Sequence, residues 1–394
     1  MSKGPIGYLW WLAFRAAWRL LGAVPFRLTA HGTDTLPGDG PYLLLPNHTG
    51  ALDPFWVAQP LGRPAHFMAS ANLFRNRVMG AFIRSLGAFP KEKFTSDRAS
   101  MRTVQRLYDE GEVVVIFPEG ARTWDGRLNP VGEGVGRMVK RLGARVVYCR
   151  IRTGHLWQPR WARWPRWVPV VLEYDPPVTY GPEVTAAEIT ADAVRRMTLP
   201  DTLPEVQPVA GWRTAEGLPD YLWACARCGQ PGGLVVHGRG RRQLRCECGA
   251  AWEVGPLGTL RGVGDVPTLS IAEAHDAMLA HFGSPPVQDP ARFGVDGVAL
   301  SVPMSRFGRL ERGSRAPVWV AAGPMTVSSA GLTVAEDGDS WVLPFEDITA
   351  ILMEMGNTLR VRTANTQYVL EVPGTPTAMV LHFARAWRGV STRP

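Results

Sequence analysis

The chain has 394 residues, of which 45% are hydrophobic and 20% charged, and its formal net charge is +8. This composition excludes a disordered chain and provides enough apolar residues for two or three domains. Residues 1–200 hold 26 of the 43 lysines and arginines but 16 of the 35 acidic residues, so the excess positive charge belongs to the N-terminal half. Many of the 15 tryptophans are close to arginines, which is typical of a surface at lipid headgroups.

The N-terminal segment is apolar but contains Arg15 and Arg19. In a spanning helix each arginine would cost about 2.5 to 3.5 kcal/mol near the bilayer centre. Residues 1–30 are therefore expected to form an amphipathic helix at the membrane interface, with a helix packed on the protein core as the alternative. With only Lys3 before the apolar run and no small-residue cleavage site after it, a secretory signal is not expected.

Short apolar runs alternate with helical patterns over residues 31–207, which predicts an α/β layer domain. The expected strands are Tyr42 to Leu45, Val113 to Phe117, Arg145 to Ile151 and Val168 to Glu173, and the expected helices are Met101 to Glu110 and Gly134 to Leu142.

The first chemical motif follows the strand that ends at Leu45. Asp53 and Pro54 are typical of an N-cap and a first helical residue, so His48 should lie in a loop just before a helix. Asp53 can turn back onto one imidazole nitrogen and leave the other as an acceptor, as a general base requires. A lone His is more often structural, so this motif by itself is weak evidence.

The second motif is Phe117-Pro118-Glu119-Gly120-Ala121-Arg122, again directly after an apolar strand. Open α/β sheets place their ligands at such strand ends. The planar fork of Arg122 suits a phosphate, and Gly120 permits close approach of the backbone. A turn with a solvated arginine is the alternative.

These two motifs resemble blocks of the glycerolipid acyltransferase family, and most closely the 1-acylglycerol-3-phosphate acyltransferases. That family carries His-x-x-x-x-Asp and Phe-Pro-Glu-Gly-x-Arg, and Gly87 to Lys93 is similar to the block between them, where Lys93 stands in place of the usual Arg. A point charge at Lys93 offers less directional control than a planar fork. The fourth block is normally a Val-Pro after an apolar strand; here it is Val147-Tyr148-Cys149-Arg150, which weakens any inference about acyl-chain or acceptor specificity.

The resemblance implies transfer of a fatty acyl group from an acyl thioester, on acyl carrier protein or coenzyme A, to the hydroxyl of a lysophospholipid. It gives His48 and Asp53 the catalytic roles, with Lys93, Glu119, Gly120 and Arg122 binding substrate and no organic cofactor. The implied acceptor is 1-acylglycerol-3-phosphate and the product phosphatidic acid. Another lysolipid or an amino-lipid is the alternative acceptor.

Two cysteine pairs, Cys225 with Cys228 and Cys246 with Cys248, predict a zinc-ribbon-like module at residues 208–256. Four thiolates suit tetrahedral Zn²⁺, although the second pair has one residue between its cysteines instead of two. The fifth cysteine, Cys149, is expected to be a core thiol. Paired thiols of this kind indicate a reducing setting, so we expect a peripheral protein on the cytoplasmic face of the cell membrane.

Residues 257–290 are expected to be a linker containing a helix from Ile271 to Phe282. Short strands with turns between them over residues 291–394, then a helix from Thr377 to Arg388, predict an antiparallel β barrel or sheet closed by that helix. This C-terminal part resembles pleckstrin-homology-like or GRAM-like domains, for which a lipid, a partner or stability alone remain equal possibilities.

The segment from His155 to Trp167 alternates Trp with Arg and is expected at headgroup level beside an anionic membrane. Its alternative is Arg stacked on Trp inside a folded loop. A rival hypothesis for the whole chain is a non-catalytic module that binds nucleic acid or lipid through the basic hairpin at Arg239, Arg241, Arg242 and Arg245. We do not expect nucleic acid as the partner, because the excess charge lies in the α/β half.

Overall fold

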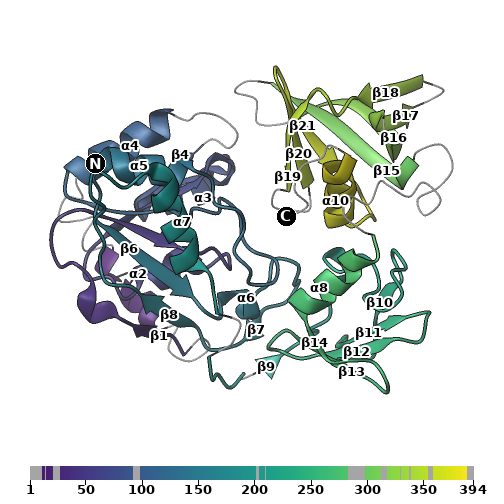
Figure 1. The fold of residues 1–394 in the computed structure, drawn as a ribbon, viewed down its shortest axis with the longest axis horizontal. Coiled ribbons are helices and arrows are strands. Elements are labelled where there is room, and N and C mark those ends of the chain that lie inside the picture. The colour runs from purple at the N-terminus through teal and green to yellow at the C-terminus, as the bar shows by residue number, and fades with distance from the viewer. Residues whose placement is uncertain are drawn as a thin grey trace. The chain divides into compact units, whose positions relative to one another are not determined.

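The computed structural model describes residues 11–13, 15–20, 27–91, 98–200, 204–208, 210–282, 298–311, 317–328, 330–336, 339–353 and 358–387. Their contacts divide the chain into two compact units. The first comprises Met1–Thr214 with Pro256–Gly258, and the second comprises Ala215–Gly255 with Thr259–Pro394. Figure 1 colours the first from purple to teal and the second mainly from green to yellow. None of the described helices is long and apolar enough to cross a membrane.

The first unit is built on a seven-stranded sheet of order β1-β8-β6-β2-β5-β3-β4. All neighbouring strands are parallel except β6 and β8, which are antiparallel. The strands are β1 (Thr29–His31), β2 (Tyr42–Pro46), β3 (Ala65–Ser70), β4 (Ala88–Lys91), β5 (Val113–Val115), β6 (Val146–Ile151) and β8 (Val171–Tyr174). The expected α/β domain is therefore present, and its central strands are apolar on both faces because both are covered.

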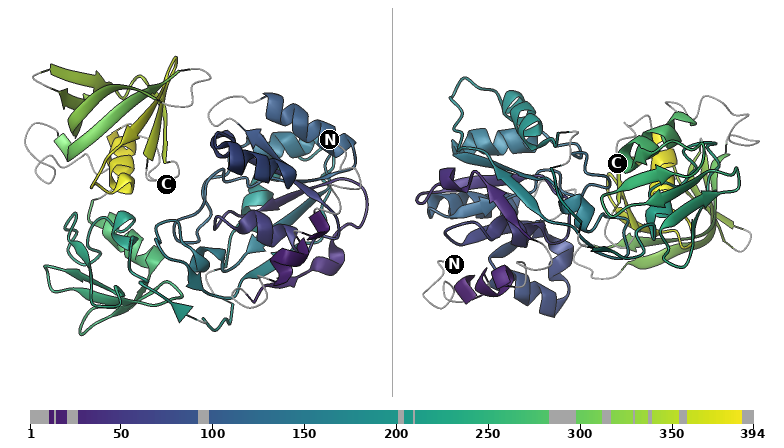
Figure 2. Two further views of the ribbon diagram at one scale, coloured as in Figure 1. Left: turned by 180° about the vertical axis from the view of Figure 1, so that it is seen from behind. Right: turned by 90° about the horizontal axis from the view of Figure 1, so that it is seen from below.

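Helices cover both faces of this sheet (Figures 1 and 2). They are α2 (Asp53–Ala58), α3 (Arg77–Ser85), α4 (Arg98–Asp109), α5 (Gly134–Leu142), α6 (Gly154–Trp157) and α7 (Ala186–Met197), with the short 3₁₀ helices η1 (Thr33–Thr35) and η2 (Ala71–Phe74). Leu43 and Leu45 pack with α4, α5 and α7, whereas Leu44, between them, packs with Trp56 of α2. This alternation follows from the two-residue period of a strand.

The N-terminal helix packs one face on the domain. Of the expected helix over residues 1–30, residues 11–13 and 15–20 are helical in the structure, and residues 1–10, 14 and 21–26 lie outside the described part. Trp11 is buried, the Arg15 Nε donates to the Gln59 carbonyl oxygen at 2.9 Å, and the Trp18 ring lies 5.0 Å from Phe55. The face of the helix that carries Trp11, Arg15 and Trp18 thus packs on the protein, as in the alternative of a helix packed on the core.

The Trp/Arg segment is also largely folded inward. A short ladder joins β7 (Arg166–Trp167) to β9 (Ala210–Gly211). Trp157, Trp161 and Arg166 are buried, and the Arg166 guanidinium stacks over the Trp161 ring at 4.6 Å. The expectation of a headgroup-level loop is therefore wrong for these residues, and the stacked alternative holds; Trp164 and Trp167 remain exposed.

The second unit begins with a five-stranded antiparallel sheet of order β10-β11-β12-β13-β14. Its strands are β10 (Leu234–His237), β11 (Gln243–Cys246), β12 (Ala251–Val254), β13 (Thr259–Gly262) and β14 (Leu269–Ser270). The 3₁₀ helix η3 (Leu218–Asp220) precedes the sheet, and α8 (Ile271–Ala280) follows it with a capping box between Ser270 and Glu273. The sheet thus continues beyond residue 256, where the sequence placed a linker.

A second antiparallel sheet of order β18-β17-β16-β15-β21-β20-β19 ends the unit, with α10 (Thr377–Trp387) against it. Its strands are β15 (Val298–Leu310), β16 (Val318–Ser328), β17 (Gly331–Glu336), β18 (Asp339–Leu343), β19 (Ile348–Met353), β20 (Thr358–Thr363) and β21 (Gln367–Glu371). In the described residues β18 and β19 are edge strands, so the expected sheet exists but no closed barrel does. The long β15 pairs with both β16 and β21.

The sequence pattern predicts two short strands here, Val318 to Ala321 and Met325 to Ser328, and in the structure both belong to β16. The chain continues through Gly323 and Pro324 between them, opposite a register shift of β15 between Val302 and Ser305. Ser305 Oγ donates to the Gly323 carbonyl oxygen at 2.9 Å across this irregularity. A β-bulge therefore accommodates Gly323 and Pro324 within the strand, where the sequence pattern indicated a turn.

The close approach of α5 to α7 generates a stability prediction. A Cβ on Gly136 would lie 1.9 Å from the Ala186 carbonyl oxygen, whereas a Cβ on Gly134 would meet nothing within 4 Å. Gly136→Ala should lower the free energy of unfolding by about 1 to 3 kcal/mol through overpacking. Gly134→Ala, in the same helix, should leave it nearly unchanged. Urea denaturation of both variants measures this, and equal midpoints would contradict the packing described.

Candidate active site

The carboxyl edge of the parallel strands gathers the two sequence motifs. His48 follows β2 by two residues and Glu119 follows β5 by four, and β2 and β5 are parallel neighbours. Strands in this arrangement end at one edge of the sheet, where α/β proteins bind ligands. Asn47 fixes the end of β2, because its side-chain oxygen accepts from the Ile151 amide of β6 at 2.7 Å and its Nδ2 donates to the Ile151 carbonyl oxygen at 3.4 Å.

The His48 and Asp53 side chains meet as expected. His48 Nδ1 lies 2.9 Å from Asp53 Oδ2, and the His48 side chain is 20% exposed while that of Asp53 is 0% exposed. The Asp53 carboxylate also accepts from the Thr49 amide at 2.5 Å, the Gly50 amide at 2.8 Å and the Thr49 hydroxyl at 3.1 Å. These hydrogen bonds hold the Asp53 carboxylate in place and fix the loop that carries the imidazole.

Asp53 does not cap the helix as the sequence predicted. The helix α2 begins at Asp53 itself, its N-cap is Leu52, and no side chain caps it. The physical reason is that the carboxylate is already occupied by His48 and by the amides of the preceding loop. The residue thus turns backward toward the base, and the expected helix starts one residue earlier than predicted.

Glu119 joins the two motifs through the backbone. Its carboxylate accepts from the His48 amide at 2.5 Å and from the Asn129 amide at 2.7 Å. Burial raises the pKa of Glu119 to about 8, and the two amide donors oppose part of that shift. The family resemblance implied a substrate-binding role for Glu119; in the structure its carboxylate holds the segment that carries His48.

A second backbone contact strengthens this connection, since the Thr123 amide donates to the His48 carbonyl oxygen at 2.8 Å. The Phe117 ring lies 4.4 Å from the imidazole. The segment 117–123 therefore contacts His48 on its amide, its carbonyl and its ring. This arrangement fixes the base from one side while Asp53 fixes it from the other.

Arg122 is joined by an arginine that the sequence analysis placed elsewhere. Arg160 Nη1 donates to the Arg122 carbonyl oxygen at 3.3 Å, and its guanidinium stacks over the Trp124 ring at 4.7 Å. Burial, and then the charge of Arg122, lower the pKa of Arg160 to about 10. Burial lowers the pKa of Arg122 as well, and the charge of Asp53 opposes that shift. Both groups remain cationic at neutral pH, which makes this part of the site attractive to an anion.

Gly120 and Lys93 are the remaining predicted site residues. Gly120 is exposed and adopts a positive φ of 66°, in the left-handed region that favours glycine, and a Cβ there would meet nothing within 4 Å. Its identity is therefore explained by backbone conformation at the turn. Lys93 lies outside the described residues, so the structure does not place it.

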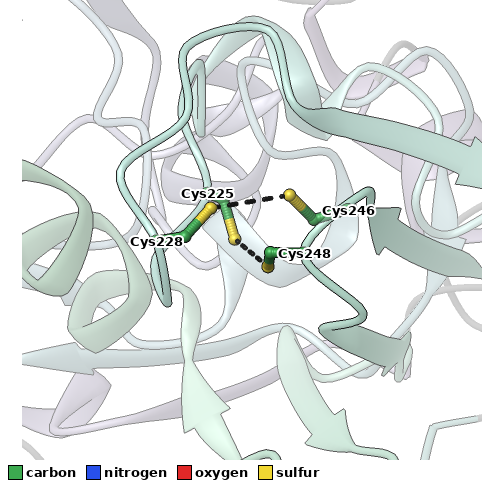
Figure 3. A group of neighbouring side chains, drawn as sticks. All are labelled: Cys225, Cys228, Cys246 and Cys248. Carbon is green, nitrogen blue, oxygen red and sulfur yellow. Dashed lines mark hydrogen bonds between the residues drawn. The ribbon is translucent and has the colours of Figure 1, made fainter.

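The four paired cysteines form a separate cluster in the second unit. Cys225 Sγ lies 3.8 Å from Cys248 Sγ, Cys228 Sγ lies 3.7 Å from Cys246 Sγ, and all four sulfurs are within 4.8 Å of one another. Figure 3 shows the sulfurs turned toward one another. A tetrahedral metal with about 2.3 Å bonds to sulfur requires sulfurs about 3.8 Å apart, so this cluster has the dimensions of a metal site. Cys149 is buried in the first core, as expected of a core thiol.

Part of the first unit is similar to known proteins. Residues 27–152 match the family model described as Acyltransferase. A 1-acyl-sn-glycerol-3-phosphate acyltransferase of Bacillus subtilis is 33% identical over 94 residues, which are 24% of this chain and 47% of that protein. A chloroplastic 1-acyl-sn-glycerol-3-phosphate acyltransferase of Brassica napus is 29% identical over 134 residues, 33% of this chain and 39% of that protein. The matched segments thus span less than half of these relatives.

Among solved structures, the 1-acyl-sn-glycerophosphate acyltransferase of Thermotoga maritima aligns with a TM-score of 0.40 and 20% identity, over 47% of this chain and 77% of that one. The matched segment of the family model contains β2, β5, His48, Asp53, Glu119 and Arg122. Residues 27–152 of this chain are therefore similar to the family described as Acyltransferase.

Proposed function

We propose that this protein transfers a fatty acyl group from an acyl thioester to the free hydroxyl of a lysophospholipid, and that its acceptor is 1-acylglycerol-3-phosphate, giving phosphatidic acid. The observation that carries the proposal is the contact between His48 Nδ1 and the buried Asp53 carboxylate at the carboxyl edge of the sheet. It directs Nε2, the other ring nitrogen, to act as a proton acceptor. The names of the relatives support the choice of acceptor.

The proposed reaction is a direct transfer. His48 removes the proton from the acceptor hydroxyl while that oxygen attacks the thioester carbonyl carbon. The ionised Asp53 stabilises the imidazolium that forms. When the tetrahedral intermediate collapses, the carbon–sulfur bond breaks and the leaving thiolate takes the proton from His48.

The acceptor phosphate is proposed to lie at Arg122 and Arg160, with Lys93 as a further cation. The two partly buried guanidinium groups repel each other, and a bound phosphate dianion would replace this repulsion with attraction. Arginine also offers the bidentate geometry that phosphate prefers. Another lysolipid or an amino-lipid remains the alternative acceptor, and it would leave this cationic pair without a dianion.

Three further assignments are proposals of the same kind. The acyl donor is a thioester of acyl carrier protein or coenzyme A, and the protein works on the cytoplasmic face of an anionic membrane. The cysteine cluster holds a structural zinc ion. The C-terminal sheet is a pleckstrin-homology-like domain, supported by its strand order and by α10 packed against it.

Replacement of the base tests the reaction. His48→Ala should lower kcat by about 10²- to 10⁴-fold, as expected on loss of a general base, with an unchanged melting temperature. His31→Ala is the matched control, because His31 is an exposed residue of β1. Product formation from labelled acyl thioester and lysophospholipid is the measurement. Full activity of His48→Ala would rule out the mechanism.

Replacement of the arginines tests the acceptor. Arg122→Ala and Arg160→Ala should each lose about 1.5 to 3 kcal/mol of transition-state binding with phosphate monoester acceptors, the usual value of a charged hydrogen bond. Acceptors without a phosphate monoester should lose less. Arg137→Ala, which removes an exposed arginine of α5, serves as control. Equal losses of kcat/KM for both acceptor classes would assign the pair a structural role.

Elemental analysis tests the metal. The purified protein should contain about one equivalent of zinc, and Cys228→Ser should lose it, because a structural site needs all four ligands. Hydrogen exchange over β10 to β12 should then increase, since metal binding stabilises the fold around it. Cys149→Ala, outside the cluster, should keep the zinc. Wild-type protein that is free of zinc yet unchanged in stability would refute the assignment.

A further inference from the structure

The helix α3 exposes an apolar face to solvent. Val78 is 81% exposed, Met79 46% and Phe82 39%, and positions i, i+1 and i+4 lie on one side of a helix. The buried residue of α3 is Gly80, where a Cβ would lie 2.9 Å from the Phe74 carbonyl oxygen of η2. The helix therefore packs on the domain through Gly80 and directs its larger apolar residues outward. An ordinary surface helix instead packs its apolar residues on the core.

The segment of the chain that contains α3 carries charges of one sign. Residues 54–91 contain no Asp or Glu, whereas they include Arg63, Arg75, Arg77, Arg84 and Lys91. Arg84 follows Arg77 by seven positions, which is two helical turns, so both lie on one flank of the helix. The Arg84 guanidinium stacks over the Phe74 ring at 4.8 Å, which fixes it at this flank. An apolar face flanked by arginines is complementary to an anionic lipid surface.

The topology places this face at the active-site edge. β3 is a parallel neighbour of β5, and α3 follows β3 through η2. The helix therefore begins at the same carboxyl edge of the sheet at which His48 and Glu119 lie. A lipid surface against the start of α3 would bring its headgroups to the edge that holds the base.

We propose that the α3 face, formed by Val78, Met79 and Phe82 with Arg77 and Arg84 at its flank, docks on a membrane of anionic phospholipid. The face adds a lipid contact to any that the N-terminal helix makes. Docking of this face does not depend on the catalytic reaction. Its purpose, which is to supply a lipid acceptor to His48, rests on the proposed function.

Vesicle binding by the full chain tests the surface. The measurement is sedimentation with sucrose-loaded vesicles of phosphatidylglycerol and phosphatidylcholine. The double variant Val78→Asp with Met79→Asp should bind at least about tenfold more weakly than the wild type, because it loses two apolar side chains that the lipid would bury. Arg77→Gln should weaken it about fivefold, the contribution of one arginine near an anionic surface. Val263→Asp, at an exposed valine of the second unit, should bind as the wild type does.

Two further measurements separate the outcomes. Amide exchange of α3 should slow when anionic vesicles are added, and turnover of detergent-dispersed acceptor should remain within twofold of wild type in the Val78 and Met79 variant. Loss of turnover by His48→Ala with intact vesicle binding would separate the catalytic proposal from this one. Unchanged vesicle binding by the α3 variants would overturn the proposal. A dimer of the wild-type chain that the same variants dissociate would overturn it too, because a second copy would then cover the face.

Discussion

The buried carboxylate of Asp53 is the constraint on which the active-site edge depends. A charge with no exposure to water is costly unless donors surround it, and here the His48 ring and the amides of Thr49 and Gly50 supply them. The same hydrogen bonds that stabilise the carboxylate set the path of the loop between β2 and α2. The orientation of the imidazole is therefore a consequence of satisfying one buried charge.

Glu119 complements this arrangement from the other motif. Its carboxyl receives the His48 amide and the Asn129 amide, so the loop after β5 and the loop after β2 are held as one piece. Two buried carboxylates close to one base would oppose each other if both were ionised. Burial and then the charge of Asp53 raise the pKa of Glu119, whereas the two amide donors limit that shift.

The opposite charge is concentrated at Arg122 and Arg160, which differ by 38 positions in the sequence and meet because the segment after α6 folds back on the site. Stacking on Trp124 holds Arg160 without neutralising it. In the second unit, two short turns bring the four thiols within metal-binding distance of one another.

The sequence determined much of this protein by local pattern. The apolar strands Tyr42 to Leu45 and Arg145 to Ile151, the pairing of His48 with Asp53 and the grouping of four cysteines are present as expected, because each depends on residues close in the chain or on a strict period. An antiparallel C-terminal sheet followed by a helix was expected for the same reason and is present, although the sheet does not close into a barrel in the described residues.

Only the tertiary structure decided which partner each polar or aromatic side chain meets. The sequence put Trp157, Trp161 and Arg160 at a membrane, whereas the fold buries both tryptophans and stacks Arg160 on Trp124, since Trp beside Arg is as stable stacked in a loop as at headgroups. It likewise did not single out α3, whose outward apolar face is visible only once the glycine side is seen to pack on η2. Local periodicity fixes which residues share a face, but which face meets the protein depends on contacts between distant segments, and these the sequence pattern does not contain.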